Sequence, residues 1–266
     1  MSTFFCYNIA KYMARIISIV NQKGGVGKTT TAVNLAAYLA HHGKFVLLID
    51  LDPQGNASSG LGINMRELEY GIYDTLASNL TMKDIIQSSN VDGLSVAPST
   101  PDLAGARVEL VDQEMREFKL HNVVLEVRND YDYIIIDCPP SLCLLTVNGM
   151  VASEEALIPV QTEYYALEGL SQLLSTVDLV KKSLKPELEI LGAVMTMYDE
   201  RNKLSKEVFN ELYQFFPNKI FRTVIPRNTR LAEAPSFGKS ILHYDKRSPG
   251  AKAYKRLAQE LISLEN

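Results

Sequence analysis

Apolar residues fill seven short stretches of the chain almost without interruption. These stretches are residues 15–20, 45–50, 94–98, 131–137, 156–160, 189–196 and 222–226. Continuous rather than alternating hydrophobicity is typical of parallel strands that are covered on both faces. We therefore predict a strand in each stretch.

Segments with helical periodicity lie between these strands. They are residues 28–41, 103–128, 165–184, 203–215 and 250–264. Strands that alternate with helices build βαβ units with a parallel sheet. The pattern predicts one α/β domain over residues 13–266, with three layers around a twisted, mainly parallel sheet.

Residues 1–12 are expected to form a short N-terminal extension. They have no basic start and no small-residue cleavage site after a long apolar core, so we do not interpret them as a signal peptide. They are also too few for an added helix-turn-helix domain, and Met13 is an alternative start. No apolar run in the chain approaches the roughly 20 residues of a membrane span.

The composition is ordinary for a soluble globular protein, with 46% hydrophobic and 22% charged residues. Cys6, Cys138 and Cys143 lack the paired spacing of a metal site, which favours a reducing, cytoplasmic setting. The charge is uneven, because residues 199–256 hold 13 basic and 6 acidic residues and the remainder holds 14 and 25. Such a basic region is a candidate phosphate-binding surface, and the alternative is a set of solvated helix faces.

The segment NQKGGVGKTT, residues 21–30, joins the first predicted strand to the first predicted helix. Its glycines allow a tight turn that brings N–H groups near phosphate oxygens, and the helix directs its positive end at the same anion. Lys28 would supply charge to the β- and γ-phosphates, and Thr29 a hydroxyl to Mg²⁺. The residues expected to bind the nucleotide here are Gly24, Gly25, Val26, Gly27, Lys28, Thr29 and Thr30.

Two other predicted strands end in carboxylates. Asp137 ends its strand at the edge where ligands bind in open α/β sheets, and it is suited to hold Mg²⁺ through water. Asp50 ends another strand, and Asp52 lies just beyond it. A carboxylate there can orient water or accept its proton. The alternative for Asp52 is a turn-forming role before Pro53.

Five segments together closely resemble the ParA/Soj partition ATPases of chromosomes and plasmids. They are KGGVGKTT, LLIDLDPQGN, YDYIIIDCPPSL, TEYYALEGL and VIPRNTRLAEAPSFGKSI. The wider class is the deviant Walker A group, which includes MinD and the nitrogenase iron protein. The resemblance covers residues 14–262 and implies a three-layer P-loop NTPase that hydrolyses ATP with Mg²⁺.

The resemblance assigns a role to the second lysine of the loop. In this family the first lysine reaches across a dimer to the nucleotide of the other subunit, so Lys23 is expected to act in trans. Asp52 is expected to position the attacking water and Asp137 to hold Mg²⁺ indirectly. Gln22 also agrees with the resemblance, since Gln precedes this lysine in many ParA-like loops. The expected catalytic residues are Lys23, Lys28 and Asp52.

The remaining site residues also follow from the resemblance. Pro226 and Asn228 are expected to cradle adenine, and Glu163 to contact the ribose. Arg201 and Arg230 lie where ParA/Soj relatives use arginines to bind double-stranded DNA non-specifically. The alternative for Arg201 is an ion pair with a neighbouring acid.

These expectations combine into an ATP-dependent homodimer in the cytoplasm, associated with the nucleoid. A ParB-like partner protein would stimulate hydrolysis, which should otherwise be slow because the loop shows no arginine finger. A MinD-like membrane ATPase is the first alternative, but we expect the apolar face of the C-terminal helix to pack on the sheet rather than on lipid. An iron–sulfur reductase is the second, but Cys138 and Cys143 do not match the spacing of cluster ligands.

Overall fold

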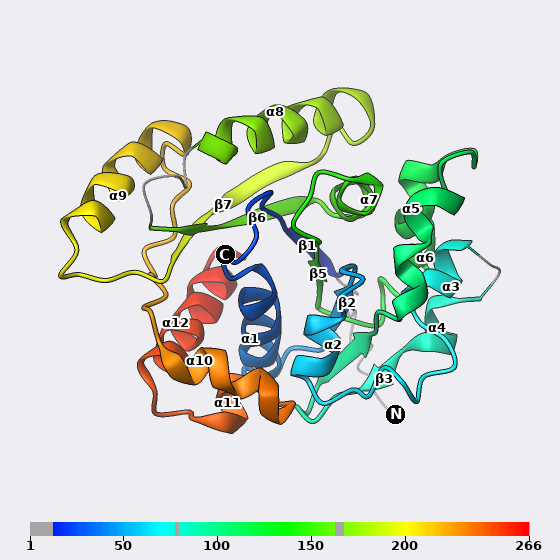
Figure 1. The fold of residues 1–266 in the computed structure, drawn as a ribbon, viewed down its shortest axis with the longest axis horizontal. Helices are drawn as coiled ribbons and strands as arrows, with labels where there is room; N and C mark the ends of the chain where they lie inside the picture. Colours follow the sequence, from blue (N-terminus) through cyan, green and yellow to red (C-terminus); the bar gives the residue numbers. More distant parts are fainter. Residues whose placement is uncertain (1–12, 78–79, 163–167, 266) are drawn as a thin grey trace, which may run out of the picture.

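A central sheet runs through the molecule in the computed structural model, which describes residues 13–265 except 78–79 and 163–167 (Figure 1). In these residues the sheet has seven strands in the order β3-β4-β2-β5-β1-β6-β7. Every neighbouring pair is parallel except β3 and β4. The strands are β1 (Arg15–Ile19), β2 (Val46–Asp50), β3 (Gln87–Ser88), β4 (Leu94–Ala97), β5 (Tyr133–Asp137), β6 (Glu155–Gln161) and β7 (Glu189–Thr196).

Helices cover both faces of this sheet, which confirms the predicted α/β fold with three layers. One face carries α1 (Lys28–His41), α2 (Asn56–Gly60), α10 (Thr229–Glu233), α11 (Ile241–Tyr244) and α12 (Pro249–Ser263). The other carries α3 (Ile72–Ala77), α4 (Met82–Ile85), α5 (Ala106–Glu109), α6 (Lys119–Leu125), α7 (Leu144–Ala152), α8 (Glu168–Ser183) and α9 (Lys203–Phe215).

Successive side chains of a strand enter different cores. Ile16 of β1 lies in the core under α7 and α8, whereas Ile17 lies in the core under α1 and α12. In β2, Leu47 and Leu48 divide in the same way. Because side chains alternate between the two faces of a strand and both faces are buried, most positions of β1 and β2 are hydrophobic, and the buried exceptions are Ser18 and Asp50.

The predicted strand at residues 222–226 is wrong. Only isolated bridges join this region to the sheet edge, at Ala193 with Ile220 and at Tyr198 with Pro226. Between the bridges, the backbone N–H groups of residues 222 and 223 donate to the Glu260 carboxylate of α12, at 2.7 and 3.0 Å. These two donors are lost to a ladder with β7, so pairing stays limited to the bridges, where Phe221 N and Ile225 N donate to Ala193 O and Met195 O. The other six predicted strands are confirmed within one or two residues.

The predicted helix over residues 103–128 is also wrong as one element. It is divided into α5, α6 and two 3₁₀ turns, Pro101–Ala104 and Arg116–Phe118. Met115 has φ of 53°, which no right-handed helix can accommodate. The Asn148 side chain of α7 accepts from Leu120 N at 3.1 Å and donates to Arg116 O at 2.8 Å, which fixes the broken course.

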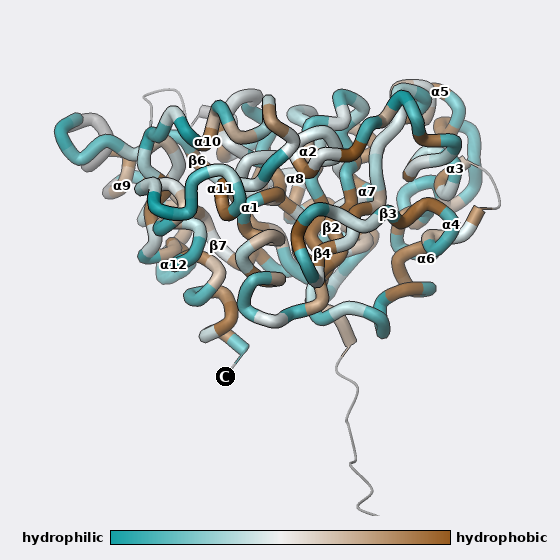
Figure 2. Tube along the Cα trace, turned by 90° about the horizontal axis from the view of Figure 1, so that it is seen from below, coloured by the Kyte–Doolittle hydropathy of each residue, from teal (hydrophilic) through white to brown (hydrophobic). Residues whose placement is uncertain are grey.

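The C-terminal helix α12 packs its apolar face inside the protein. Tyr254, Leu257 and Leu261 are buried in the core that α1 and the sheet share, and Figure 2 shows the tube of α12 alternating between hydrophilic and hydrophobic colours. The Tyr254 hydroxyl lies 3.1 Å from Thr31 Oγ1 of α1. In the described residues, no helix is long and apolar enough to cross a membrane.

Candidate nucleotide-hydrolysis site

Neighbouring strands hold the glycine loop between β1 and α1 in place. The Asn21 amide donates to Pro159 O at 2.7 Å, and its oxygen accepts from Lys23 N at 3.0 Å. The Thr196 hydroxyl at the end of β7 donates to Val26 O at 2.7 Å. The loop is thus anchored at both ends to β6 and β7 before any ligand arrives.

Two glycines of the loop need the left-handed conformation. Gly25 has φ of 75° and Gly27 has φ of 87°, values that cost an L-residue with a side chain about 1–2 kcal/mol. Gly24 and Gly25 are exposed, so their backbone is open to an approaching anion. Gly27 precedes the first residue of α1, where helix N–H groups and the helix dipole favour negative charge.

Lys28 lies buried beneath the loop. Its side chain is only 6% exposed, and its ammonium donates to Lys23 O at 3.0 Å. Burial lowers the pKa of Lys28, and the nearby Asp137 carboxylate acts in the opposite direction. A cation held this close to exposed loop amides is placed to meet a polyphosphate. The Lys23 side chain is half-buried on the same loop.

Asp137 is a fully buried carboxylate at the end of β5, and no residue in the described part donates a hydrogen bond to either oxygen. Burial raises the pKa of Asp137 well above its usual range, and the Asp50 charge adds to this effect. The Thr29 hydroxyl lies close enough to lower that pKa but does not complete a hydrogen bond of ordinary geometry. A buried, unpartnered acid beside Thr29 and Lys28 fits a site for hydrated Mg²⁺ and phosphate.

Asp50 differs from Asp137 although the two residues are paired in register on β2 and β5. The Asp50 carboxylate accepts from Asp52 N at 3.2 Å, from Ser58 N at 2.8 Å and from Ser58 Oγ at 2.7 Å. Burial nonetheless raises the pKa of Asp50 to about 6. Asp52 follows at the strand end and is 8% exposed, and its carboxylate accepts from Gln54 N at 3.0 Å.

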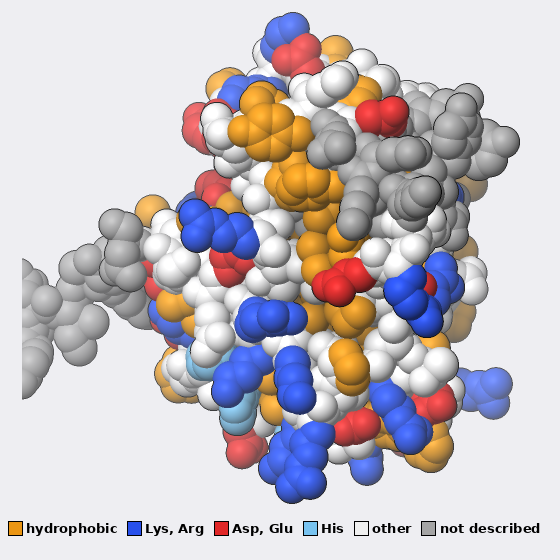
Figure 3. All heavy atoms as spheres, turned by 90° about the vertical axis from the view of Figure 1, so that its left-hand side faces the viewer, with side chains coloured by type: hydrophobic (Ala, Val, Ile, Leu, Met, Phe, Trp, Pro, Cys, Tyr) orange, Lys and Arg blue, Asp and Glu red, His pale blue; other side chains and the backbone are white. Residues whose placement is uncertain are grey.

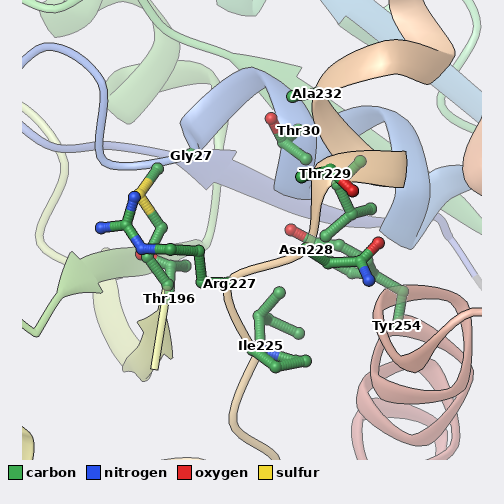
Figure 4. A pocket seen from close by; sticks show the side chains of 12 residues that line it. Gly27, Thr30, Thr196, Ile225, Arg227, Asn228, Thr229, Ala232 and Tyr254 are labelled. Atoms are coloured by element: carbon green, nitrogen blue, oxygen red, sulfur yellow. The ribbon is translucent and has the colours of Figure 1, made fainter. Parts of the chain in front are cut away.

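A mostly apolar pocket of about 290 Å³ opens beside the start of α1 (Figure 4). Pro226 and Asn228, the residues expected to cradle adenine, line it, and Figure 4 shows Thr196 and Arg227 across from Thr30, Thr229 and Tyr254 in this view. The Asn228 Oδ1 atom is buried without a hydrogen-bond donor among the described residues. Glu163, the predicted ribose contact, lies outside the described residues. The lining residues that the sequence did not indicate are Thr196, Met197, Ile225, Arg227, Thr229, Leu231, Ala232 and Tyr254.

The two predicted DNA-binding arginines are exposed and form ion pairs. Arg201 holds Asp199 through two hydrogen bonds of 3.0 and 2.9 Å. Arg230 donates to Glu233 at 2.8 Å and lies 3.7 Å from Asp245. The ion pair that was the alternative for Arg201 is therefore present in the structure.

The two cysteines in the described part of the chain are free thiols. Cys138 is buried behind Asp137, and burial raises its pKa well above its usual range. Cys143 is half-buried just before α7. Cys138 belongs to the core, and Cys143 packs against its margin.

Comparison with known proteins agrees with this geometry. A family model described as an AAA domain matches residues 14–190. The sporulation initiation inhibitor protein Soj of Bacillus subtilis is 55% identical over 94% of this chain and 99% of its own length. The chromosome partitioning protein ParA of Myxococcus xanthus is 50% identical over 94% of this chain and 88% of its own length.

A solved structure gives the same result for the fold. Cobyrinic acid a,c-diamide synthase from Mycobacterium smegmatis, with bound ADP and magnesium, superimposes with a TM-score of 0.83. It is 34% identical, and the match covers 94% of each chain. The higher identity to Soj and ParA confirms the resemblance expected from the sequence motifs. The chain belongs to the Soj/ParA family of chromosome-partitioning ATPases.

Proposed function

We propose that this protein is an ATP-dependent switch for the partition of a chromosome or plasmid. With ATP it forms a homodimer that binds double-stranded DNA without sequence preference, and this places it on the nucleoid. Hydrolysis, stimulated by a ParB-like partner protein, releases it. The observation that carries the proposal is the buried, unpartnered Asp137 beside Lys28, at the mouth of a loop built to meet phosphate.

Different residues around the loop bind the phosphates, the Mg²⁺ ion and the adenine of ATP. Backbone N–H groups of the loop and the Lys28 ammonium hold the phosphates, and Thr29 with Asp137 holds hydrated Mg²⁺. Bound Mg²⁺ neutralises charge on the phosphates of ATP. Pro226 and Asn228 hold the adenine in the apolar pocket at the start of α1.

Asp52 acts on the water that attacks the γ-phosphate. It lies at the carboxyl end of β2, next to the strand that carries Asp137, and a carboxylate there can orient that water or accept its proton. The Lys23 side chain contacts the nucleotide bound by the other subunit rather than the nucleotide bound by its own. Dimer formation thus completes both sites, and loss of the γ-phosphate weakens the dimer.

The basic residues of the C-terminal region form the proposed DNA surface. Figure 3 shows the side of the molecule that lies on the left in Figure 1, and Lys and Arg side chains gather on its lower half. A groove of about 630 Å³ beside the nucleotide pocket is lined by Arg201, Arg227, Lys252 and Arg256. Exposed ion pairs such as Arg201 with Asp199 are weak because water screens them, so phosphate groups can displace the acids.

Filter binding to two unrelated DNA duplexes tests the switch. A monomer makes few phosphate contacts, and a dimer doubles them, so affinity should rise steeply when the dimer forms. We expect tight binding to both duplexes with Mg-ATP and little binding with Mg-ADP. Equal binding with the two nucleotides would refute the switch, and preference for one duplex would refute non-specific recognition.

A further inference from the structure

A single buried carboxylate ties the two ends of the turn that carries Asp52. Asp50 Oδ1 accepts from Asp52 N at the start of the turn, and Asp50 Oδ2 accepts from Ser58 N in α2 after its end. Within the turn, Asp52 O accepts from Gly55 N at 2.9 Å. The position of the Asp52 backbone therefore depends on where the Asp50 carboxylate points.

The Ser58 hydroxyl fixes that direction together with the Ser58 backbone N–H. It donates to Asp50 Oδ2 at 2.7 Å and accepts from Ser99 N, just beyond β4, at 3.1 Å. Ser58 is 0% exposed, so water cannot replace either bond. Its hydroxyl is thus oriented from one side by β4 and orients Asp50 on the other.

Ser58 belongs to neither ligand site of the proposed function. It does not line the nucleotide pocket, and the side-chain hydrogen bonds of Ser58 go to Asp50 and Ser99 rather than to the glycine loop. A series of hydrogen bonds runs from the end of β4 across α2 to the end of β2, through Ser99, Ser58, Asp50 and Asp52. It connects two strands that are neighbours in the sheet.

We infer that Ser58 is a positioning residue for hydrolysis, acting on Asp52 through Asp50. This inference rests on the proposed role of Asp52 in activating water. A displacement of a reacting group by about 1 Å can cost about a hundredfold in rate, and loss of a partner that orients such a group costs about 10–100-fold. The Ser58 hydroxyl should therefore affect the hydrolysis rate and leave ATP affinity unchanged.

Ser99 provides a matched control on the same network. Its hydroxyl is also fully buried, but it makes only a long contact of 3.4 Å to Thr100 O, and the Ser99 backbone N–H is what meets Ser58. Ser99→Ala removes a buried hydroxyl and keeps the network. Ser58→Ala removes the hydroxyl bonds to Asp50 and Ser99, and Ser58→Cys replaces the hydroxyl with a weak donor of nearly the same volume. Both variants keep the bond from Ser58 N to Asp50 Oδ2, so they test the hydroxyl alone.

The experiment measures the single-turnover hydrolysis rate and the Kd for Mg-ATP in the full-length parent and in all three variants. We expect Ser58→Ala and Ser58→Cys to slow hydrolysis about tenfold or more, with parental Kd and ATP-dependent dimerisation. Ser99→Ala should hydrolyse ATP at the parental rate. If the Ser58 variants also match the parent, or if Ser99→Ala loses as much as they do, the inference is wrong.

Asp52→Ala, measured alongside, separates this inference from the proposed function. If Asp52→Ala loses hydrolysis and the Ser58 variants do not, only the positioning role of Ser58 fails. If Asp52→Ala hydrolyses ATP normally, the proposed role of Asp52 fails, and the inference that rests on it fails too.

Discussion

Asp50 and Asp137 should respond in opposite ways to the same substitution. Both are 0% exposed, and they face each other in register on β2 and β5. Asp50 accepts three hydrogen bonds, whereas Asp137 accepts none from the described residues. Replacement by Asn removes the charge and keeps the shape, so the difference in partners decides the result.

The magnitudes follow from these partners. In Asp50→Asn the amide nitrogen cannot accept from the donors around it, and a lost hydrogen bond to a charged group costs about 1.5–3 kcal/mol. In Asp137→Asn the cost of burying an unpartnered charge disappears, and the gain is about 1–2 kcal/mol because the Lys28 charge already offsets part of that cost. For a chain of this size, each kcal/mol moves Tm by about 2–4 °C.

Thermal unfolding without and with Mg-ATP measures both effects. Without nucleotide, Asp137→Asn should raise Tm by about 2–8 °C and Asp50→Asn should lower it by about 3–12 °C. Ligand at a hundredfold excess over Kd should stabilise the parent by about 2.7 kcal/mol, and Asp137→Asn should lose most of this gain.

The sign of the pH dependence gives a second check. Because the pKa of Asp137 is raised in the folded state, the folded protein holds a proton that the unfolded chain releases, so this group's contribution to stability falls as pH rises through its folded pKa. The advantage of Asp137→Asn should therefore be largest near neutral pH and shrink in acid. A nucleotide-free Asp137→Asn that is less stable than the parent at neutral pH would refute the reasoning.

Three further predictions concern the loop and the basic surface. Lys28→Ala should abolish tight ATP binding in calorimetry, whereas Lys23→Ala should keep binding by the monomer and lose ATP-dependent dimerisation; equal loss of binding would contradict the trans role. Gly27→Ala should destabilise the nucleotide-free protein by about 1–2 kcal/mol in urea unfolding, because its φ is 87°. Gly24→Ala should cost less, since Gly24 is not among the glycines with positive φ and its added Cβ would lie 4.0 Å from the Pro140 Cβ, and equal costs would remove the conformational explanation. Arg230→Ala should dimerise with ATP and flatten the log–log salt dependence of DNA binding by up to about 1.8, and an unchanged slope would assign this arginine to structure alone.

The sequence by itself determined the elements whose signals are local. Helix α1 begins and ends at the predicted residues, and six of the seven predicted strands are present, because burial on both faces leaves a continuous apolar stretch. The glycine loop was predictable because its signal is also local: the strand, the glycines, the Lys-Thr pair and the helix follow one another directly in the sequence. The short helices α2, α10 and α11 are too brief to show a period of their own.

Tertiary structure decided what side chains from distant segments do together. Residues 222–226 have the composition of a strand, but Glu260 of α12 accepts from the backbone N–H groups of residues 222 and 223, which interrupts pairing with β7. The pocket at the start of α1 combines the loop with residues 196–197, 225–232 and 254. The resemblance pointed to Pro226 and Asn228, but only the fold shows which distant segments join them. Asp50 and Asp137 look alike in sequence, since each ends a buried strand. One is hydrogen-bonded because α2 brings Ser58 against it, and the other is left for a ligand, because only the folded chain determines which donors reach a buried carboxylate.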